Sequence, residues 1–95
     1  MFADAPRLVG GDFNMQPGDA TYTDMTGSFG DVWAALVNTG DQGTTVEAYG
    51  QSAQRARVDQ WWQERSDAHA RATEVWVIKT SRSSHHAVIA EVNVQ

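Results

Sequence analysis

The sequence contains no cysteine, so neither a disulfide bond nor a thiolate metal site can stabilise this chain of 95 residues. It also lacks any apolar run of the roughly 18 residues that a membrane-spanning helix requires. Asp4 and Arg7 interrupt the only apolar stretch near the start, which argues against a signal peptide. We therefore expect no membrane contact and, by default, a cytoplasmic location.

Basic residues are few. Seven Lys and Arg residues against 12 Asp and Glu residues give a formal net charge of -5 at pH 7. Proteins that bind nucleic acid through bulk electrostatics usually carry a basic face, so the composition argues against that mode of binding. It leaves open an enzyme that meets phosphates at one small site, where a bound cation supplies positive charge.

Four tryptophans, Trp33, Trp61, Trp62 and Trp76, are many for a chain of this length. Each can cover a large apolar area. The length predicts one small domain over residues 1–95 with a modest core. So much aromatic surface predicts either a well-filled core or an interface with a partner.

Apolar periodicity and turn residues predict an α/β fold. Helices are expected over residues 20–25, with Asp19 as the N-cap, and 31–37, with Asp31 as the N-cap. Residues 66–71 fit either a loop or a single helical turn. Strands are expected over residues 8–11, 44–46, 57–63, 72–79 and 86–94. The strand over residues 8–11 is expected to be buried.

The first polar cluster is Gly11-Asp12-Phe13-Asn14, directly after an apolar strand. A strand that ends in a carboxylate and an amide places both at the sheet edge where open α/β sheets tend to bind ligands. Asp12 can orient or deprotonate a water, and Asn14 can donate to a phosphate oxygen. The alternative is an ordinary strand-to-turn exit, where Asp and Asn are common.

Two further polar clusters flank strands of the second half. His85 and His86 precede the last strand, and a histidine there can donate to a phosphate or transfer a proton near neutral pH. Asp59 could hydrogen-bond His85 and fix its tautomer. The alternatives are a surface histidine pair and a strand with alternating exposed charges. We expect His86 to point away from His85 and to contribute little.

The three clusters occur in the order, and with roughly the spacing, of the C-terminal half of the endonuclease/exonuclease/phosphatase superfamily. That family includes pancreatic-type deoxyribonucleases and abasic-site endonucleases. Gly11 to Asn14 resembles its Gly-Asp-Phe-Asn motif. Arg57-Val58-Asp59-Gln60 is similar to its Arg-Ile-Asp-Tyr strand, and Ser83-Ser84-His85 to its terminal Ser-Asp-His motif. The resemblance covers nearly the whole chain.

The resemblance implies a metal-dependent phosphodiester hydrolase that uses Mg²⁺ or Mn²⁺, with a nuclease acting on DNA as the favoured case. Asp12 would orient or deprotonate the attacking water, and Asn14 would hold the scissile phosphate. His85 would stabilise the pentacovalent transition state, and Asp59 would hold His85 in place. Asp12 and Asn14 would be the metal ligands, together with several waters. RNA, a lipid headgroup and a small phosphodiester stay open as substrates.

Two departures from the family pattern change the expectation. Ser84 stands where the family has aspartate, which predicts weaker metal binding. The family's N-terminal half, with its asparagine, metal-gripping glutamate and second histidine, has no obvious counterpart before Gly11. The chain would then form one sheet-plus-helices layer pair, half of a four-layer sandwich that a homodimer completes. The alternatives are a catalytically impaired binding or regulatory module on the same scaffold, and a fragment without a function of its own.

Overall fold

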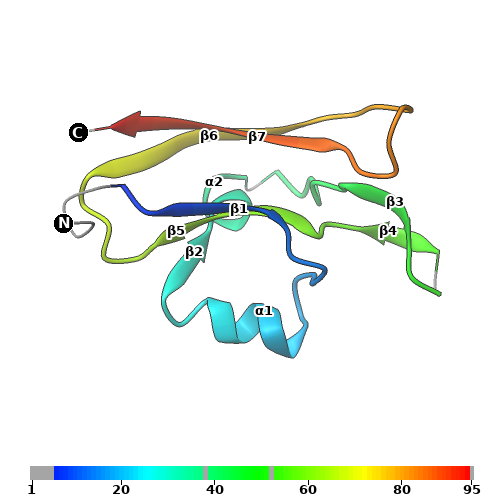
Figure 1. Cartoon of the computed structure of the whole chain (residues 1–95), viewed down its shortest axis with the longest axis horizontal. Helices are drawn as coiled ribbons and strands as arrows, with labels where there is room; N and C mark the ends of the chain where they lie inside the picture. Colours follow the sequence, from blue (N-terminus) through cyan, green and yellow to red (C-terminus); the bar gives the residue numbers. More distant parts are fainter. Residues whose placement is uncertain (1–5, 38, 52, 95) are drawn as a thin grey trace.

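The computed structural model describes residues 6–37, 39–51 and 53–94, and these form strands joined by short loops and two short helices (Figure 1). The helices are α1 (Ala20–Met25) and α2 (Val32–Leu36). The strands are β1 (Leu8–Asp12), β2 (Phe29–Asp31), β3 (Val46–Tyr49), β4 (Gln54–Ala56), β5 (Asp59–Glu64), β6 (Ala70–Ile78) and β7 (Ala87–Val94).

The described strands form three separate antiparallel sheets. One has three strands in the order β1-β5-β2, and β3–β4 and β6–β7 are two-stranded. The β6–β7 ribbon runs along one side of the β1–β5 layer, and α1 lies on the other side (Figure 1). β5 therefore runs between α1 and the ribbon, and its alternate residues face these two neighbours.

The ribbon-facing side of β5 holds the layers together through hydrogen bonds from side chains. Trp61 Nε1 donates to the carbonyl oxygen of Val88 at 3.0 Å, and Gln63 Nε2 donates to that of Ala70 at 2.6 Å. Gly10 pairs with Trp61 across the β1–β5 register, and a Cβ on Gly10 would lie 2.5 Å from the indole. Glycine is required there because the tryptophan ring covers the backbone of β1.

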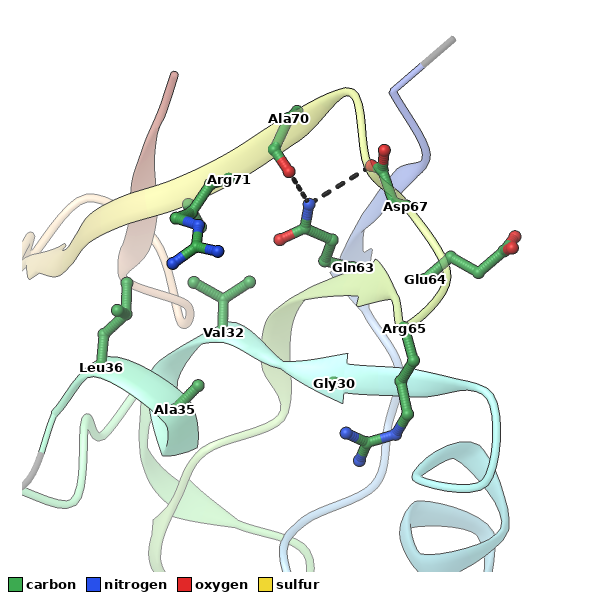
Figure 2. Close-up of a pocket in the computed structure, with 11 residues that line it drawn as sticks. Gly30, Val32, Ala35, Leu36, Gln63, Glu64, Arg65, Asp67, Ala70 and Arg71 are labelled. Atoms are coloured by element: carbon green, nitrogen blue, oxygen red, sulfur yellow. Dashed lines mark hydrogen bonds between the residues drawn. The ribbon is translucent and has the colours of Figure 1, made fainter. Parts of the chain in front are cut away.

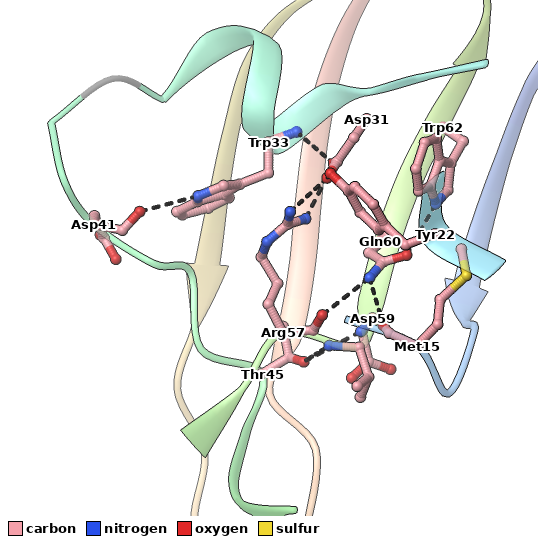
Figure 3. A network of polar contacts seen from close by, with 11 residues as sticks. Met15, Tyr22, Asp31, Trp33, Asp41, Thr45, Arg57, Asp59, Gln60 and Trp62 are labelled. Carbon is pink, nitrogen blue, oxygen red and sulfur yellow. Dashed lines mark hydrogen bonds and ion pairs between the residues drawn. The ribbon is translucent and has the colours of Figure 1, made fainter. Parts of the chain in front are cut away.

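The opposite side of β5 contributes a buried polar core. Trp62 is fully buried, and its Nε1 donates to Gln60 Oε1 at 3.0 Å. Next to it, Arg57 and Asp31 form a buried ion pair whose carboxylate also accepts from the Tyr22 hydroxyl (Figure 3). Buried charges of this kind are tolerated because each is paired and hydrogen-bonded.

The predicted elements are largely confirmed. The helix at residues 20–25 and the last three strands agree with the structure to within two residues, and Asp31 caps α2 by accepting from the N–H of Trp33. Asp19 also precedes its helix, but its carboxylate accepts from the N–H of Gln16 instead of a helical N–H. The segment 66–71 is a turn that leads into β6 and is not helical.

Other expectations need correction. The α/β class agrees only loosely with the described residues, because strands predominate and every sheet is antiparallel. β1 is mostly exposed and not buried, with Val9 at 43% exposure, and it is an edge strand of its three-stranded sheet. The predicted strand at 44–46 begins only at Val46, since Thr45 bonds to other segments. In the described part of the chain, no helix is long and apolar enough to cross a membrane.

Candidate active site

The end of β1 fixes the carboxylate of Asp12. Asp12 is the last residue of β1 and lies directly opposite Asp59 in the β1–β5 register. The N–H of Phe13 still bonds to the carbonyl oxygen of Val58 at 2.9 Å, and the N–H of Asn14 then turns back to Asp12 Oδ1 at 2.8 Å. Asn14 has a φ of 49°, a left-handed conformation that asparagine tolerates better than most residues.

A buried side chain of β5 holds the loop after Asn14. Gln60 is 2% exposed, and its Nε2 donates to the carbonyl oxygens of Met15 at 2.8 Å and Arg57 at 2.9 Å (Figure 3). A buried amide whose partners are all main-chain groups or a tryptophan N–H has little freedom to move. The backbone that carries Asp12 and Asn14 is therefore held to β5 on both sides of the turn.

His85 lies between the two carboxylates. Its Nδ1 is 2.7 Å from Asp59 Oδ2, and its Nε2 is 3.8 Å from Asp12 Oδ2. A carboxylate only accepts hydrogen bonds, so the proton between His85 and Asp59 lies on Nδ1. The longer distance is not a hydrogen bond, and it leaves Nε2 and the Asp12 carboxylate facing a shared opening at the surface.

The electrostatics of the cluster favour the charged ring. The hydrogen bond that His85 donates to Asp59 raises the pKa of His85 above its ordinary value of 6.5, and the charges of Asp59 and Asp12 act in the same direction. Partial desolvation opposes this shift. A larger fraction of imidazolium is therefore present near neutral pH, and an imidazolium can donate from Nε2 to an anionic oxygen.

Asn14 is oriented by a tyrosine. The hydroxyl of Tyr49 donates to Asn14 Oδ1 at 2.7 Å and also lies 3.2 Å from the carbonyl oxygen of Asn14. With its oxygen engaged in this way, the amide presents its NH₂ group as the donor for an anionic ligand. Sequence reasoning missed Tyr49, because a contact over 35 positions leaves no local pattern.

The four residues that the sequence singled out thus meet at one place. Asp12, Asp59 and His85 each offer a ligand atom within 4.8 Å of the others, and Asn14 follows Asp12 in the same turn. Asp59 begins β5, whereas His85 lies in the loop before β7, a strand of a separate sheet. The contact between them is made by side chains alone.

The prediction that His86 contributes little to the site stays a prediction, and the structure gives this side chain a structural role. His86 is 9% exposed, its Nδ1 accepts from the N–H of Thr80 at 3.1 Å, and its Nε2 lies 2.9 Å from Glu47 Oε2. It does point away from His85, but that direction leads under β3 and not into solvent. The hydrogen bond from His86 lowers the pKa of Glu47, and Arg55 adds to this shift. His86 therefore fastens the loop after β6 to the β3–β4 hairpin.

The donor set of the cluster partly fits the ion that the family resemblance implies. Mg²⁺ and Mn²⁺ prefer oxygen ligands, and magnesium usually binds through one or two carboxylates while keeping several waters. Asp12 Oδ2 is suited to this, because Oδ1 is already bonded to Asn14 and the side chain is 49% exposed. Asn14 Oδ1 would serve through its second lone pair, beside the hydroxyl of Tyr49. Ser84 is exposed and brings no carboxylate.

The cluster lies on an open surface. A cavity of about 390 Å³ lies elsewhere, between α2, β2 and the start of β6, where Gln63 bonds to Ala70 and Asp67 (Figure 2). A cavity of about 610 Å³ lies between Trp33 and the edge of β6. Neither is lined by Asp12, Asp59 or His85.

Comparisons with known proteins give no support for a particular family: no family model, no curated protein and no solved structure matches the chain.

Proposed function

We propose that the chain is a divalent-metal-dependent phosphodiester hydrolase, with DNA as its favoured substrate, and that Asp12, Asn14, Asp59 and His85 form its active site. The convergence of these residues is the observation that supports the proposal. They lie in three segments that are distant in the sequence, yet Asp12, Asp59 and His85 lie within 4.8 Å of one another, and Asn14 follows in the same turn as Asp12. Fold resemblance alone would be a weaker argument, because one scaffold can serve many functions.

The contacts suggest a role for each side chain. The carboxylate of Asp12 orients the attacking water, which loses its proton to solvent as its oxygen bonds to phosphorus and the bond to the leaving oxygen breaks. Asn14 donates its NH₂ group to a phosphate oxygen. The imidazolium of His85 donates from Nε2 to a second oxygen, where negative charge develops in the transition state. Asp59 keeps the ring oriented through Nδ1.

Mg²⁺ or Mn²⁺, held by Asp12 and Asn14, would polarise the phosphate and neutralise the leaving oxygen. Loose binding is expected, since Asp59 is committed to His85 and Ser84 adds no charge. The acidic chain would then depend on the cation to attract a phosphodiester.

The proposal includes a homodimer that covers the open site and completes the four-layer sandwich. The support is the exposed apolar face of the β6–β7 ribbon, where Trp76 is 38% and Ile78 is 51% exposed. Trp33 and Trp62 cannot contribute to such an interface, because they are buried within the chain at 8% and 0% exposure. Of the surface that the tryptophans were expected to offer a partner, the part on the β6–β7 ribbon is the part that the proposal uses.

A second function is favoured by Ser84. A site without that carboxylate could bind a phosphodiester without cleaving it, as a binding or regulatory module. This alternative and the hydrolase differ in one measurement: the module would retain nucleic acid in a binding assay and release no cleaved product.

A plasmid-nicking assay tests the proposed function. The protein is incubated with supercoiled DNA in Mg²⁺, in Mn²⁺ and in chelator, and the nicked form is quantified. His85→Ala, purified identically, reports any contaminating nuclease. Metal-dependent nicking that disappears in His85→Ala supports the proposal, whereas nicking equal in both proteins, or none in either metal, refutes it.

A further inference from the structure

Thr45 lies between the two segments that carry the Asp59–His85 pair. It is fully buried, and its hydroxyl oxygen accepts from the N–H groups of Val58 at 3.1 Å and Asp59 at 3.2 Å (Figure 3). Its carbonyl oxygen accepts from the N–H of His86 at 2.7 Å. One residue thus holds the backbone of Asp59 and the backbone immediately after His85.

Together with the hydrogen bond from Trp61 Nε1 to the carbonyl oxygen of Val88, these contacts connect the two sides of the pair. β5 and β7 lie in different sheets, so no ladder of backbone hydrogen bonds sets the distance between Asp59 and His85. The N–H of Asp59 lies where β5 begins, beyond the last residue that pairs with β2. Without the Thr45 hydroxyl, two successive N–H groups at the start of β5 would lose their acceptor, which buried backbone groups rarely do.

Thr45 is itself well anchored. Its N–H donates to the carbonyl oxygen of Ala56 at 2.9 Å, at the end of β4. The next residue, Val46, packs with Ala56 and Val58 in a small apolar cluster. The hydroxyl and the carbonyl of Thr45 are therefore fixed relative to each other by the hairpin and can act as a rigid spacer.

We propose that Thr45 is a positioning residue that holds Asp59 and His85 at hydrogen-bonding distance and thereby keeps the proton of the neutral ring on Nδ1. The effect of Thr45 on catalysis rests on the proposed function, whereas its effect on the spacing and the tautomer of the Asp59–His85 pair is independent of that function. A displacement of about 1 Å in a catalytic group can cost on the order of a hundredfold in rate, so small shifts at this spacer matter.

The test compares Thr45→Val with Thr45→Ser. Valine keeps the branched shape but removes the acceptor oxygen, and serine keeps the oxygen. The tautomer of His85 is read from its imidazole nitrogen shifts, through the carbon-bound ring protons, at a pH above its pKa. We expect the Nδ1–H form in the wild type and in Thr45→Ser, and a change towards the Nε2–H form in Thr45→Val.

Activity is the second measurement. Thr45→Val should lower kcat for plasmid nicking by roughly 10- to 100-fold with little change in KM, and Thr45→Ser should restore most of it. Val46→Ala is the matched control, because it weakens the same hairpin without touching the hydroxyl. If Thr45→Val does not fold, Thr45→Ala replaces it, since it removes the oxygen without pressing a methyl group on the N–H groups.

The outcomes separate the two proposals. An unchanged His85 tautomer in a folded Thr45→Val or Thr45→Ala protein overturns the positioning role, as does an equal change in Val46→Ala. If Thr45→Val loses the Nδ1–H form of His85 and the wild-type protein cleaves no DNA, the positioning role is supported and the hydrolase is refuted.

Discussion

Asp12 and Asp59 lie directly opposite each other in the β1–β5 register, and the imidazole of His85 is 3.8 Å from the first carboxylate and 2.7 Å from the second. Like charges in opposite positions of a sheet destabilise it. The protonated ring offsets this repulsion from one side, and a cation at Asp12 would offset it further. The proposed metal site at Asp12 would relieve the same repulsion that the ring relieves.

His85→Ala should remove most phosphodiesterase activity and leave the fold intact, because the side chain is half-exposed and its contacts are confined to the two carboxylates. Donor groups of this kind contribute about 10²- to 10⁴-fold in rate. Asp59→Asn should be nearly as harmful, because the ring loses the acceptor that orients it. kcat for DNA nicking is the measurement, with circular dichroism to confirm folding.

His69 provides a control for this pair of variants. It lies in the connection between β5 and β6, and its main-chain N–H donates to the carboxylate of Asp67. His69→Ala should therefore leave kcat unchanged. A loss of less than about tenfold in His85→Ala would place His85 outside the site.

The activity should depend on pH through His85. Its pKa is raised by Asp59, so the imidazolium form persists above the ordinary value of 6.5 and is lost as the pH rises through the raised pKa. The rate should fall across that window, and so should the stability contributed by the ion pair, which is fully present below pH 6.5. Asp59→Asn should move the alkaline limb of the kcat profile to lower pH. An unshifted limb would assign it to another group.

His86→Ala should destabilise the protein and not alter the chemistry directly. The substitution removes the buried imidazole and the acceptor of the Thr80 N–H, while Glu47 keeps its ion pair with Arg55. Loss of these contacts of the buried ring should cost about 1 to 3 kcal/mol in total in the free energy of unfolding. Urea denaturation should show the loss, and kcat per folded molecule should stay near the wild-type value. A stable but inactive variant would mean that His86, and not His85, serves the site.

The difference between the two histidines shows where the sequence was informative. Alternation along residues 86–94 predicts correctly that His85 and His86 face opposite ways. It does not reveal that the β3–β4 hairpin covers His86, because the bond to Glu47 spans 39 positions. Strand positions followed from local alternation in the same manner, whereas the division into three antiparallel sheets depends on distant pairings.

The candidate site residues were selected through short motifs, and the residues around them were not. Thr45 lies in a segment that was expected only as a short strand, and Tyr49 lies just beyond it. Their roles rest on a buried hydroxyl with two N–H donors and on a phenol that reaches Asn14. Neither contact leaves a mark on local periodicity.

Ser84→Asp should tighten metal binding. The residue is exposed beside His85, and an added carboxylate near Asp12 raises the negative charge available to a divalent cation. Calorimetric titration with Mn²⁺ should give a lower Kd, and nicking should saturate at a lower metal concentration. Ser81→Asp, on the same exposed loop, controls for charge alone. Equal effects of the two substitutions would contradict the alignment of Ser84 with the family aspartate.

The assembly prediction rests on one face of the β6–β7 ribbon. Trp76 and Ile78 share that face with their cross-strand partners Ile89 and Ala87, and exposed apolar patches of this kind often mark interfaces. A homodimer that buries it should cover roughly 2,000 Å² or more in total.

Light scattering at micromolar concentration should give twice the chain mass, and Ile78→Lys should give the monomer with reduced nicking. Val9→Lys, an exposed apolar position on β1, should leave the dimer intact. A monomeric wild type that nicks DNA would show that one copy suffices, and the sandwich completed by a second copy would then be wrong.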